Sequence, residues 1–170
     1  GLFGQDRPRG NFSVDKFGVF FVRAQGASGD YNLNFLNNNL SVELKGRLLP
    51  GDSQFEVKLE IPFDRDFLQG EVRGRLTNLD FLLPWKGASG SVDYLLSFQG
   101  PVAGLDLTGA VELRGNLIPI PGFAHALNDF SGLAFVKNGR VSIRSFQGLL
   151  GGGPVQGFGE LAFGATGLDE

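Results

Sequence analysis

The chain has 170 residues, a net charge of −3 at pH 7 and no cysteine. Its 42% content of hydrophobic residues is enough to bury a core, which argues against a disordered chain. The negative charge argues against nucleic acid as the main partner, and the lack of cysteine excludes a disulfide framework and a thiolate metal site.

Apolar and polar residues alternate through much of the chain. Within residues 54–63, Phe55, Val57, Leu59 and Ile61 alternate with charged side chains. Successive side chains of a strand point to opposite faces, so this period of two predicts strands with one apolar and one wet face. Further strands of this kind are predicted at residues 11–22, 30–36, 40–49 and 70–79.

The alternation stops at residues 80–86, which are predicted to form a crossing segment, and it resumes after Gly87. The pair Asn138-Gly139 is typical of a two-residue hairpin turn, because both residues tolerate positive φ. The strands predicted in this second half cover residues 90–99, 105–116, 132–136, 140–146 and 155–163.

The two halves read as two repeats of about five strands each, residues 1–86 and residues 87–170. The pattern predicts an all-β fold with a mainly antiparallel sheet. A β-sandwich or a small barrel would bury the apolar face inside the domain. A long curled sheet with an open hydrophobic groove is the third architecture, and the 27 glycines and the uniformly Phe, Leu, Val and Ile apolar positions favour it.

No arrangement of residues indicates catalysis or metal binding. His125 has no carboxylate or second histidine near it in sequence to orient it as a base. Asp64 and Asp66 lack the oxygen-rich loop of a calcium site, and Gly151–Gly153 lacks the lysine and helix start of a phosphate loop. We therefore expect no enzyme activity and no cofactor.

The last third of the chain carries an ordered series of degenerate motifs. A strand with a central glycine precedes a turn and an alternating strand, and a glycine cluster leads into a strand of the form hydrophobic-x-Gly-x-Gly-x-Leu. The residues concerned are Asn128–Phe135, Asn138–Ile143, Ser145–Gly148, Gly151–Gly153 and Val155–Leu161, with Leu105–Leu113 as the strand upstream. In this order they resemble the C-terminal domain of the TamB family and, more loosely, AsmA-like proteins, over about Gly87–Phe163.

The resemblance implies a repeating β-groove, also called a β-taco, in a protein that crosses the periplasm and is anchored in the inner membrane through regions outside this segment. It implies a role in moving phospholipid toward the outer membrane, with acyl chains shielded in the groove. The alternative is a scaffold that binds nascent strands of outer-membrane barrel proteins by strand addition. The sequence does not begin with methionine, so we expect an excised segment whose open ends can self-associate.

The predicted groove lining consists of the apolar residues that share one strand face. No covalent chemistry is required of them, because the groove only lowers the cost of carrying hydrocarbon through water. The predicted lining residues are Leu40, Val42, Leu44, Phe55, Val57, Leu59, Ile61, Val92, Tyr94, Leu96, Phe98, Leu105, Leu107, Val111, Leu113, Phe135, Val141, Ile143, Leu161 and Phe163.

Overall fold

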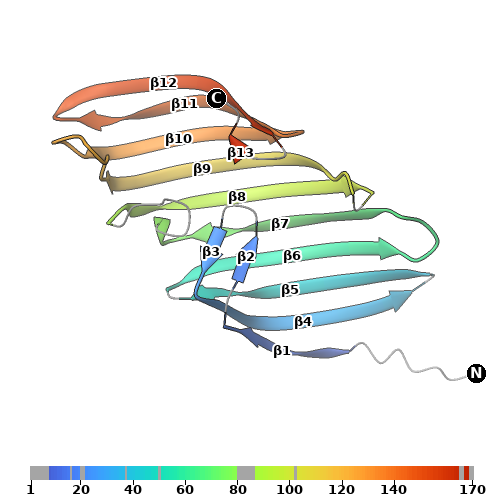
Figure 1. Ribbon diagram of the computed structural model, residues 1–170. Coiled ribbons are helices and arrows are strands. Elements are labelled where there is room, and N and C mark those ends of the chain that lie inside the picture. The colour runs from blue at the N-terminus through green and yellow to red at the C-terminus, as the bar shows by residue number, and fades with distance from the viewer. Residues whose placement is uncertain are drawn as a thin grey trace, which may run out of the picture.

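The computed structural model describes residues 8–15, 17–19, 22–36, 38–49, 51–79, 87–101, 103–164 and 167–168. Most of them form one 11-stranded sheet (Figure 1). Its strands are β1 (Arg9–Val14), β4 (Gly26–Leu36), β5 (Asn39–Leu49), β6 (Ser53–Pro62), β7 (Leu68–Leu76), β8 (Ser89–Gly100), β9 (Asp106–Ile118), β10 (Leu127–Lys137), β11 (Arg140–Leu150), β12 (Gly153–Gly164) and β13 (Gly167–Leu168). A separate hairpin of β2 (Phe17–Val19) and β3 (Val22–Ala24) lies between β1 and β4 in the sequence.

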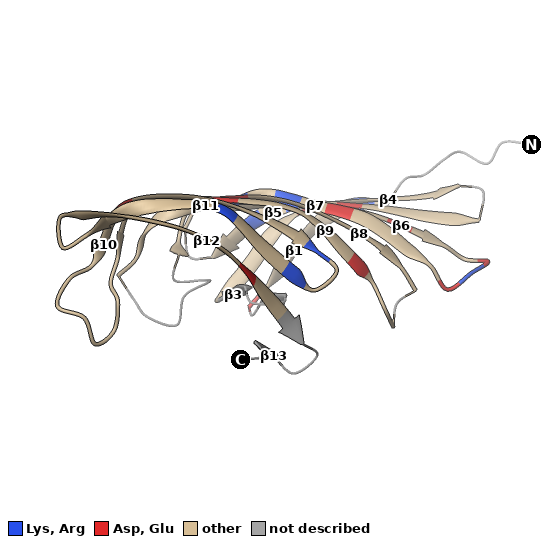
Figure 2. Ribbon diagram, turned by 90° about the horizontal axis from the view of Figure 1, so that it is seen from above, with Lys and Arg blue, Asp and Glu red and all other residues tan. Residues whose placement is uncertain are grey.

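The strands follow one another across the sheet in the order β1-β4-β5-β6-β7-β8-β9-β10-β11-β12-β13, and each pair of neighbours is antiparallel. The two ends of this order do not meet, so the sheet is open rather than closed into a barrel. Seen from above, it is a single bowed layer (Figure 2). The predicted all-β fold with a long, curled, open antiparallel sheet is confirmed.

The predicted crossing segment 80–86 lies outside the described residues. The strands on either side of it, β7 and β8, pair along the whole of Leu68–Leu76. The two halves of the chain therefore contribute to one continuous sheet.

The hairpin turn between β10 and β11 is the one predicted from sequence. Asn138 and Gly139 both have positive φ, at 48° and 74°. This conformation matches the twist of the flanking strands, and asparagine and glycine are the residues that adopt it at least cost. The turn fixes the pairing of Lys137 with Arg140 and so sets the register of the strands behind it.

Cross-strand register divides the side chains between two faces. Leu44 lies between Tyr31 and Val57, and the same row continues through Val72 to Leu96. This side of the sheet is called the apolar face. The residues next to these in sequence lie on the opposite side, which is called the polar face. There Asp30, Lys45, Glu56 and Arg73 are cross-strand neighbours.

The apolar face is buried at one end of the strands and open at the other. At the packed end, where β4, β6 and β8 begin, the buried residues are Ala27, Leu48, Phe55, Leu76, Leu79, Val92, Leu127 and Phe130. Ala88, Ile118 and Ile120, in or beside the connections, pack against this cluster. At the open end Phe35 and Phe63 stack with ring centroids 6.4 Å apart, yet they remain 58% and 56% exposed.

Glycines on the apolar face are covered by aromatic rings from the next strand. Gly46 lies opposite Phe55 and Gly74 opposite Tyr94, and a Cβ at either glycine would come within 2.9 Å and 2.8 Å of ring carbons. A carbonyl oxygen of the neighbouring strand also occupies that space at both positions. The same arrangement joins Gly10 with Tyr31, Gly70 with Phe98, Gly115 with Phe130 and Gly132 with Phe146.

The sheet contains the same cross-strand row of three glycines and one phenylalanine twice, each time on four neighbouring strands. On β4–β7 the side-by-side residues are Gly29, Gly46, Phe55 and Gly74, and on β8–β11 they are Gly90, Gly115, Phe130 and Gly148. The two strand sets lie in the two predicted repeats, so the halves share a structural row that their sequences do not show as a motif.

Among the described residues, no helix has the length and apolar character needed to cross a bilayer.

We predict opposite stability effects for alanine at two apolar-face glycines. Gly74→Ala should lower the free energy of unfolding by about 2–3 kcal/mol, because its Cβ would strike the Gln54 carbonyl and the Tyr94 ring. Gly159→Ala should be neutral or stabilising by up to about 1 kcal/mol, because no atom lies within 4 Å of its Cβ position and the unfolded chain loses entropy. Denaturant unfolding measures both, and equal losses would contradict the ring-over-glycine account.

Candidate functional site

The structure brings most of the predicted lining residues onto one face. Leu40, Val42 and Leu44 on β5 lie opposite Ile61, Leu59 and Val57 on β6, in that order. The face continues on β8 and β9, where the paired residues are Val92 with Leu113, Tyr94 with Val111, and Phe98 with Leu107. Leu96, Phe55, Val141, Ile143 and Leu161 lie on the same face by register.

Three predicted residues are placed differently. Phe135 lies on the polar face, where it pairs with Ala110 and is 42% exposed. Leu105 precedes the start of β9 and is exposed. The backbone of Phe163 belongs to β12, but its side chain lies outside the described part of the structure.

The misplacement of Phe135 has a local cause. From Gly132 to Val136 apolar residues occupy both alternating positions, so period two alone does not assign a face. Phe130 and Gly132 settle the assignment, because the Phe130 ring covers Gly115 and the Phe146 ring covers Gly132 on the apolar face. Phe135 then points the other way, where the Arg144 guanidinium lies 6.0 Å from its ring centroid.

Several apolar-face residues were missed by sequence reasoning. They are Phe12, Tyr31, Leu33, Phe35, Val72, Phe130, Val136, Phe146 and Val155. The glycine pattern would have found some of them, because Tyr31, Phe130 and Phe146 each lie close to a glycine on a neighbouring strand.

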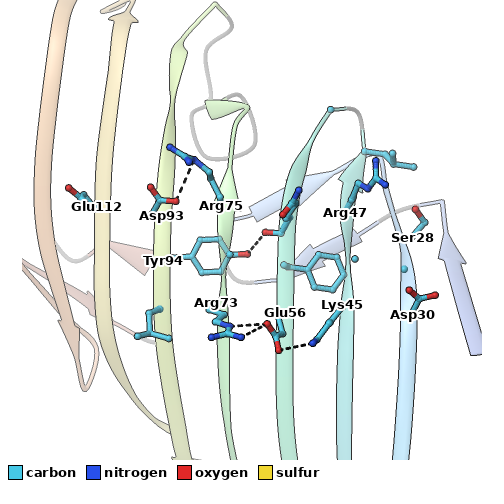
Figure 3. Close-up of a pocket in the computed structure, with 18 of the residues that line it drawn as sticks. Ser28, Asp30, Lys45, Arg47, Glu56, Arg73, Arg75, Asp93, Tyr94 and Glu112 are labelled. Atoms are coloured by element: carbon cyan, nitrogen blue, oxygen red, sulfur yellow. Dashed lines mark hydrogen bonds and ion pairs between the residues drawn. The ribbon is translucent and has the colours of Figure 1, made fainter. Parts of the chain in front are cut away.

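Tyr94 is the polar exception on the apolar face. Its ring lies over Gly74, and its hydroxyl donates a 3.4 Å hydrogen bond to the Gln54 carbonyl oxygen (Figure 3). Burial among apolar neighbours raises its pKa to about 12, because the phenolate would lose its hydration. The phenol is therefore neutral at any physiological pH and adds no charge to this face.

The polar face carries a shallow hollow that runs from β4 to β10, and its lining includes charged side chains from several strands (Figure 3). Glu56 lies at its centre, where it bonds Arg73 Nε at 2.9 Å and lies 3.3 Å from Lys45 Nζ. On the neighbouring strands Arg75 lies 3.5 Å from Asp93, and Arg114 pairs with Glu112. The pairs of Glu56 with Arg73 and Lys45 and of Arg75 with Asp93 link side chains across strands, so they favour the observed register, whereas Arg114 and Glu112 both lie on β9.

Glu56 has the best-defined charge environment on this face. Its side chain is 17% exposed, against 53% for Arg73 and 62% for Lys45. Hydrogen bonding to Arg73 holds the pKa of the Glu56 carboxyl below its usual value of 4.5, against an opposing effect of burial. The carboxylate is therefore ionised throughout the neutral range.

The polar face joins several of its charged side chains in ion pairs. Within the described ranges, no group of three or more His, Asp or Glu side chains could hold a metal ion. What the arrangement offers is an apolar surface on one side of a sheet and a salt-bridged, hydrated surface on the other.

We predict that Glu56→Gln lowers the melting temperature at pH 7 and that the loss disappears in acid. The depressed pKa means that the carboxylate stabilises the fold above about pH 4.5, and that this contribution is lost as the pH falls through the folded-state pKa. Thermal unfolding of both proteins between pH 7 and pH 2 measures the effect.

Gln54→Glu is the matched control for that variant. Gln54 lies between Arg47 and Arg75, as Glu56 lies between Lys45 and Arg73. A carboxylate there should raise the melting temperature in low salt, and the gain should shrink in high salt. A lower melting temperature in low salt would contradict the view that these cross-strand charge pairs stabilise the sheet.

We also predict that alkaline pH destabilises the protein through Tyr94. Between pH 10 and about pH 12 the phenol ionises in the unfolded chain but stays neutral in the fold, so stability declines across this window. Tyr94→Phe should flatten the decline. Denaturant midpoints at pH 9 and pH 11 measure it, and an unchanged slope in the variant would refute the assignment.

Comparison with protein-family models, curated proteins and solved structures gives no match for this chain.

Proposed function

We propose that the apolar face binds the acyl chains of phospholipid and shields them from water. The observation that carries this proposal is the continuity of the face, which runs without interruption by charge from β4 through β9 in rows such as Leu44, Val57, Val72 and Leu96. Each methylene removed from water on such a surface contributes about 0.8 kcal/mol, so a lipid tail gains several kcal/mol by lying along it.

The partial exposure of the face supports the same reading. Phe35, Phe63 and Leu161 at the open end are exposed, while the residues of the packed end are buried. Soluble monomers rarely expose apolar patches larger than a few hundred Å², and larger patches mark binding surfaces. A lipid tail covers such a surface without the need for a matching protein partner.

The apolar face has low-lying side chains, which suits a ligand that slides along it better than one held at a fixed position. Phe55, Tyr94 and Phe98 lie over glycines instead of standing upright, which lowers the surface at these positions. The row of Leu44, Val57, Val72 and Leu96 carries no charged side chain, and the phenol of Tyr94 is neutral. An acyl chain would therefore meet similar surroundings at each strand.

The setting that fits this chemistry is the one implied by the resemblance to the TamB and AsmA-like families. There the segment would form part of a periplasmic bridge, anchored in the inner membrane by other regions of the protein, along which phospholipid moves toward the outer membrane. The polar face, with its paired charges, would face the aqueous compartment.

We predict that the purified protein retains phospholipid and that a charge on the apolar face expels it. Val57→Asp and Leu96→Arg should each remove most of the bound lipid, because an unpaired charge on an apolar surface repels hydrocarbon. Native mass spectrometry, followed by lipid extraction, measures the occupancy.

Ser97→Arg is the matched control, since it adds the same charge one residue away on the polar face, opposite Glu71. It should leave lipid binding unchanged. Equal lipid content in Leu96→Arg and the unaltered protein, with both folded by circular dichroism, would exclude the apolar face as the acyl site.

A further inference from the structure

Two neighbouring rows on the polar face of β5–β7 place a residue of β6 between two basic side chains. In the first row Glu56 lies between Lys45 and Arg73. Its carboxylate bonds Arg73 Nε at 2.9 Å and lies 3.3 Å from Lys45 Nζ, so one oxyanion contacts both cations. The row shows that basic side chains on alternate strands of this sheet can share a single oxyanion that lies between them.

The second row repeats this layout without the carboxylate. Gln54 lies between Arg47 and Arg75, two residues along each strand from the first row. Arg47 and Gln54 are exposed, and within the described ranges the Arg47 guanidinium has no ion pair. Ser28, on the other side of Arg47, adds a hydroxyl group. The second row therefore offers positive charge and hydrogen-bond donors, but no anion of its own.

The carboxylates that border this row leave the space over Gln54 open. Asp93 lies 3.5 Å from Arg75 Nε, and Arg75 turns toward it, while Arg47 lies on the far side of β6 (Figure 3). The two side chains of that pair are 44% and 56% exposed, and exposed ion pairs contribute little to stability. Glu112 pairs with an arginine of its own strand, and Asp30 lies two strands from Gln54, on β4. Asp93 is thus the one bordering carboxylate that competes for this row.

The geometry of the second row favours a tetrahedral oxyanion over a carboxylate. The strands of Arg47 and Arg75 are separated by β6, so their backbones lie about 10 Å apart. An anion from solvent must bond both guanidinium groups across this gap and also the amide of Gln54 between them. A carboxylate has two oxygens for these three donors, whereas a phosphate monoester has three free oxygens and a charge of about −1.5 to −2 at pH 7.

We propose that Arg47, Gln54 and Arg75 bind the phosphate group of a phosphate monoester or free phosphate. Each arginine donates to one phosphate oxygen, and the Gln54 amide donates to a third. The hollow that contains these residues has a volume of about 1020 Å³, which leaves space for the organic part of an ester. This inference does not depend on lipid binding, because the three side chains lie on the polar face.

The test is a titration of the whole chain at constant ionic strength, followed by nuclear magnetic resonance. The probes are inorganic phosphate, glycerol 3-phosphate and dimethyl phosphate, a monoanionic diester with the linkage of a phospholipid headgroup. The first two should shift the Nε–Hε signals of Arg47 and Arg75 and the side-chain amide signals of Gln54. Dimethyl phosphate should bind about tenfold more weakly, because it has lost one charge and one free oxygen.

Four variants separate this site from general attraction to a basic surface. Arg47→Gln should weaken phosphate binding about five- to tenfold. Asp93→Asn should strengthen it about two- to threefold, because Arg75 is released from its exposed pair. Gln54→Glu should abolish binding, since its carboxylate takes the place of the ligand. Arg144→Gln is the matched control, because it removes the same charge beside Phe135 on the polar face, outside the hollow, and should leave the affinity unchanged.

Equal weakening by Arg47→Gln and Arg144→Gln would overturn the proposal, as would the absence of signal shifts at Arg47 and Arg75 with millimolar phosphate. Equal affinity for dimethyl phosphate and glycerol 3-phosphate would assign the site to phosphodiester headgroups and would also overturn it. Leu96→Arg, on the apolar face, should keep the affinity for phosphate. Its lipid content and its phosphate affinity therefore test the two proposals separately.

Discussion

The fold depends on how apolar side chains are buried on one face of a single bowed sheet. In a sandwich a second sheet supplies the opposing surface, whereas here neighbouring strands of the same sheet supply part of it. Rings from one strand lie over glycines of the next, as Phe55 does over Gly46 and Tyr94 over Gly74. Each glycine leaves the space that a ring occupies, which helps to bury rings such as those of Phe55 and Phe130.

The two faces divide the requirements of stability and function. On the polar face, Glu56 bonds Arg73 and lies near Lys45, which favours one register without any need for burial. On the apolar face, the strand register aligns apolar side chains across the sheet, and the glycines let neighbouring rings lie close to the backbone. A substitution on one face therefore has a neighbour on the other that serves as its control, as Leu96 and Ser97 do.

Period two was enough to predict strands with one apolar face, and local backbone preference was enough to predict the Asn138-Gly139 turn. Period two left a sandwich, a barrel and an open sheet as alternatives, and the glycine content and the uniformly apolar positions favoured the open sheet. It was also enough to place residues such as Val57 and Leu96 on a common face. It failed at Phe135, where apolar residues occupy both alternating positions and the choice of face depends on rings from other strands meeting Gly115 and Gly132. It gave no sign of the polar-face hollow, because the partners of Glu56 come from β5 and β7, which only the folded register brings together.

The recurrence of the glycine and phenylalanine row every four strands has a thermodynamic consequence. A sheet of this kind has no central core on which all strands depend, since each strand contacts mainly its two neighbours. Its stability is then close to a sum of strand terms and nearest-neighbour interface terms, as in linear repeat proteins. Unfolding in such a system proceeds inward from the edges rather than in one step, and the strands near the middle of the order, such as β7 and β8, are the last to lose their hydrogen bonds.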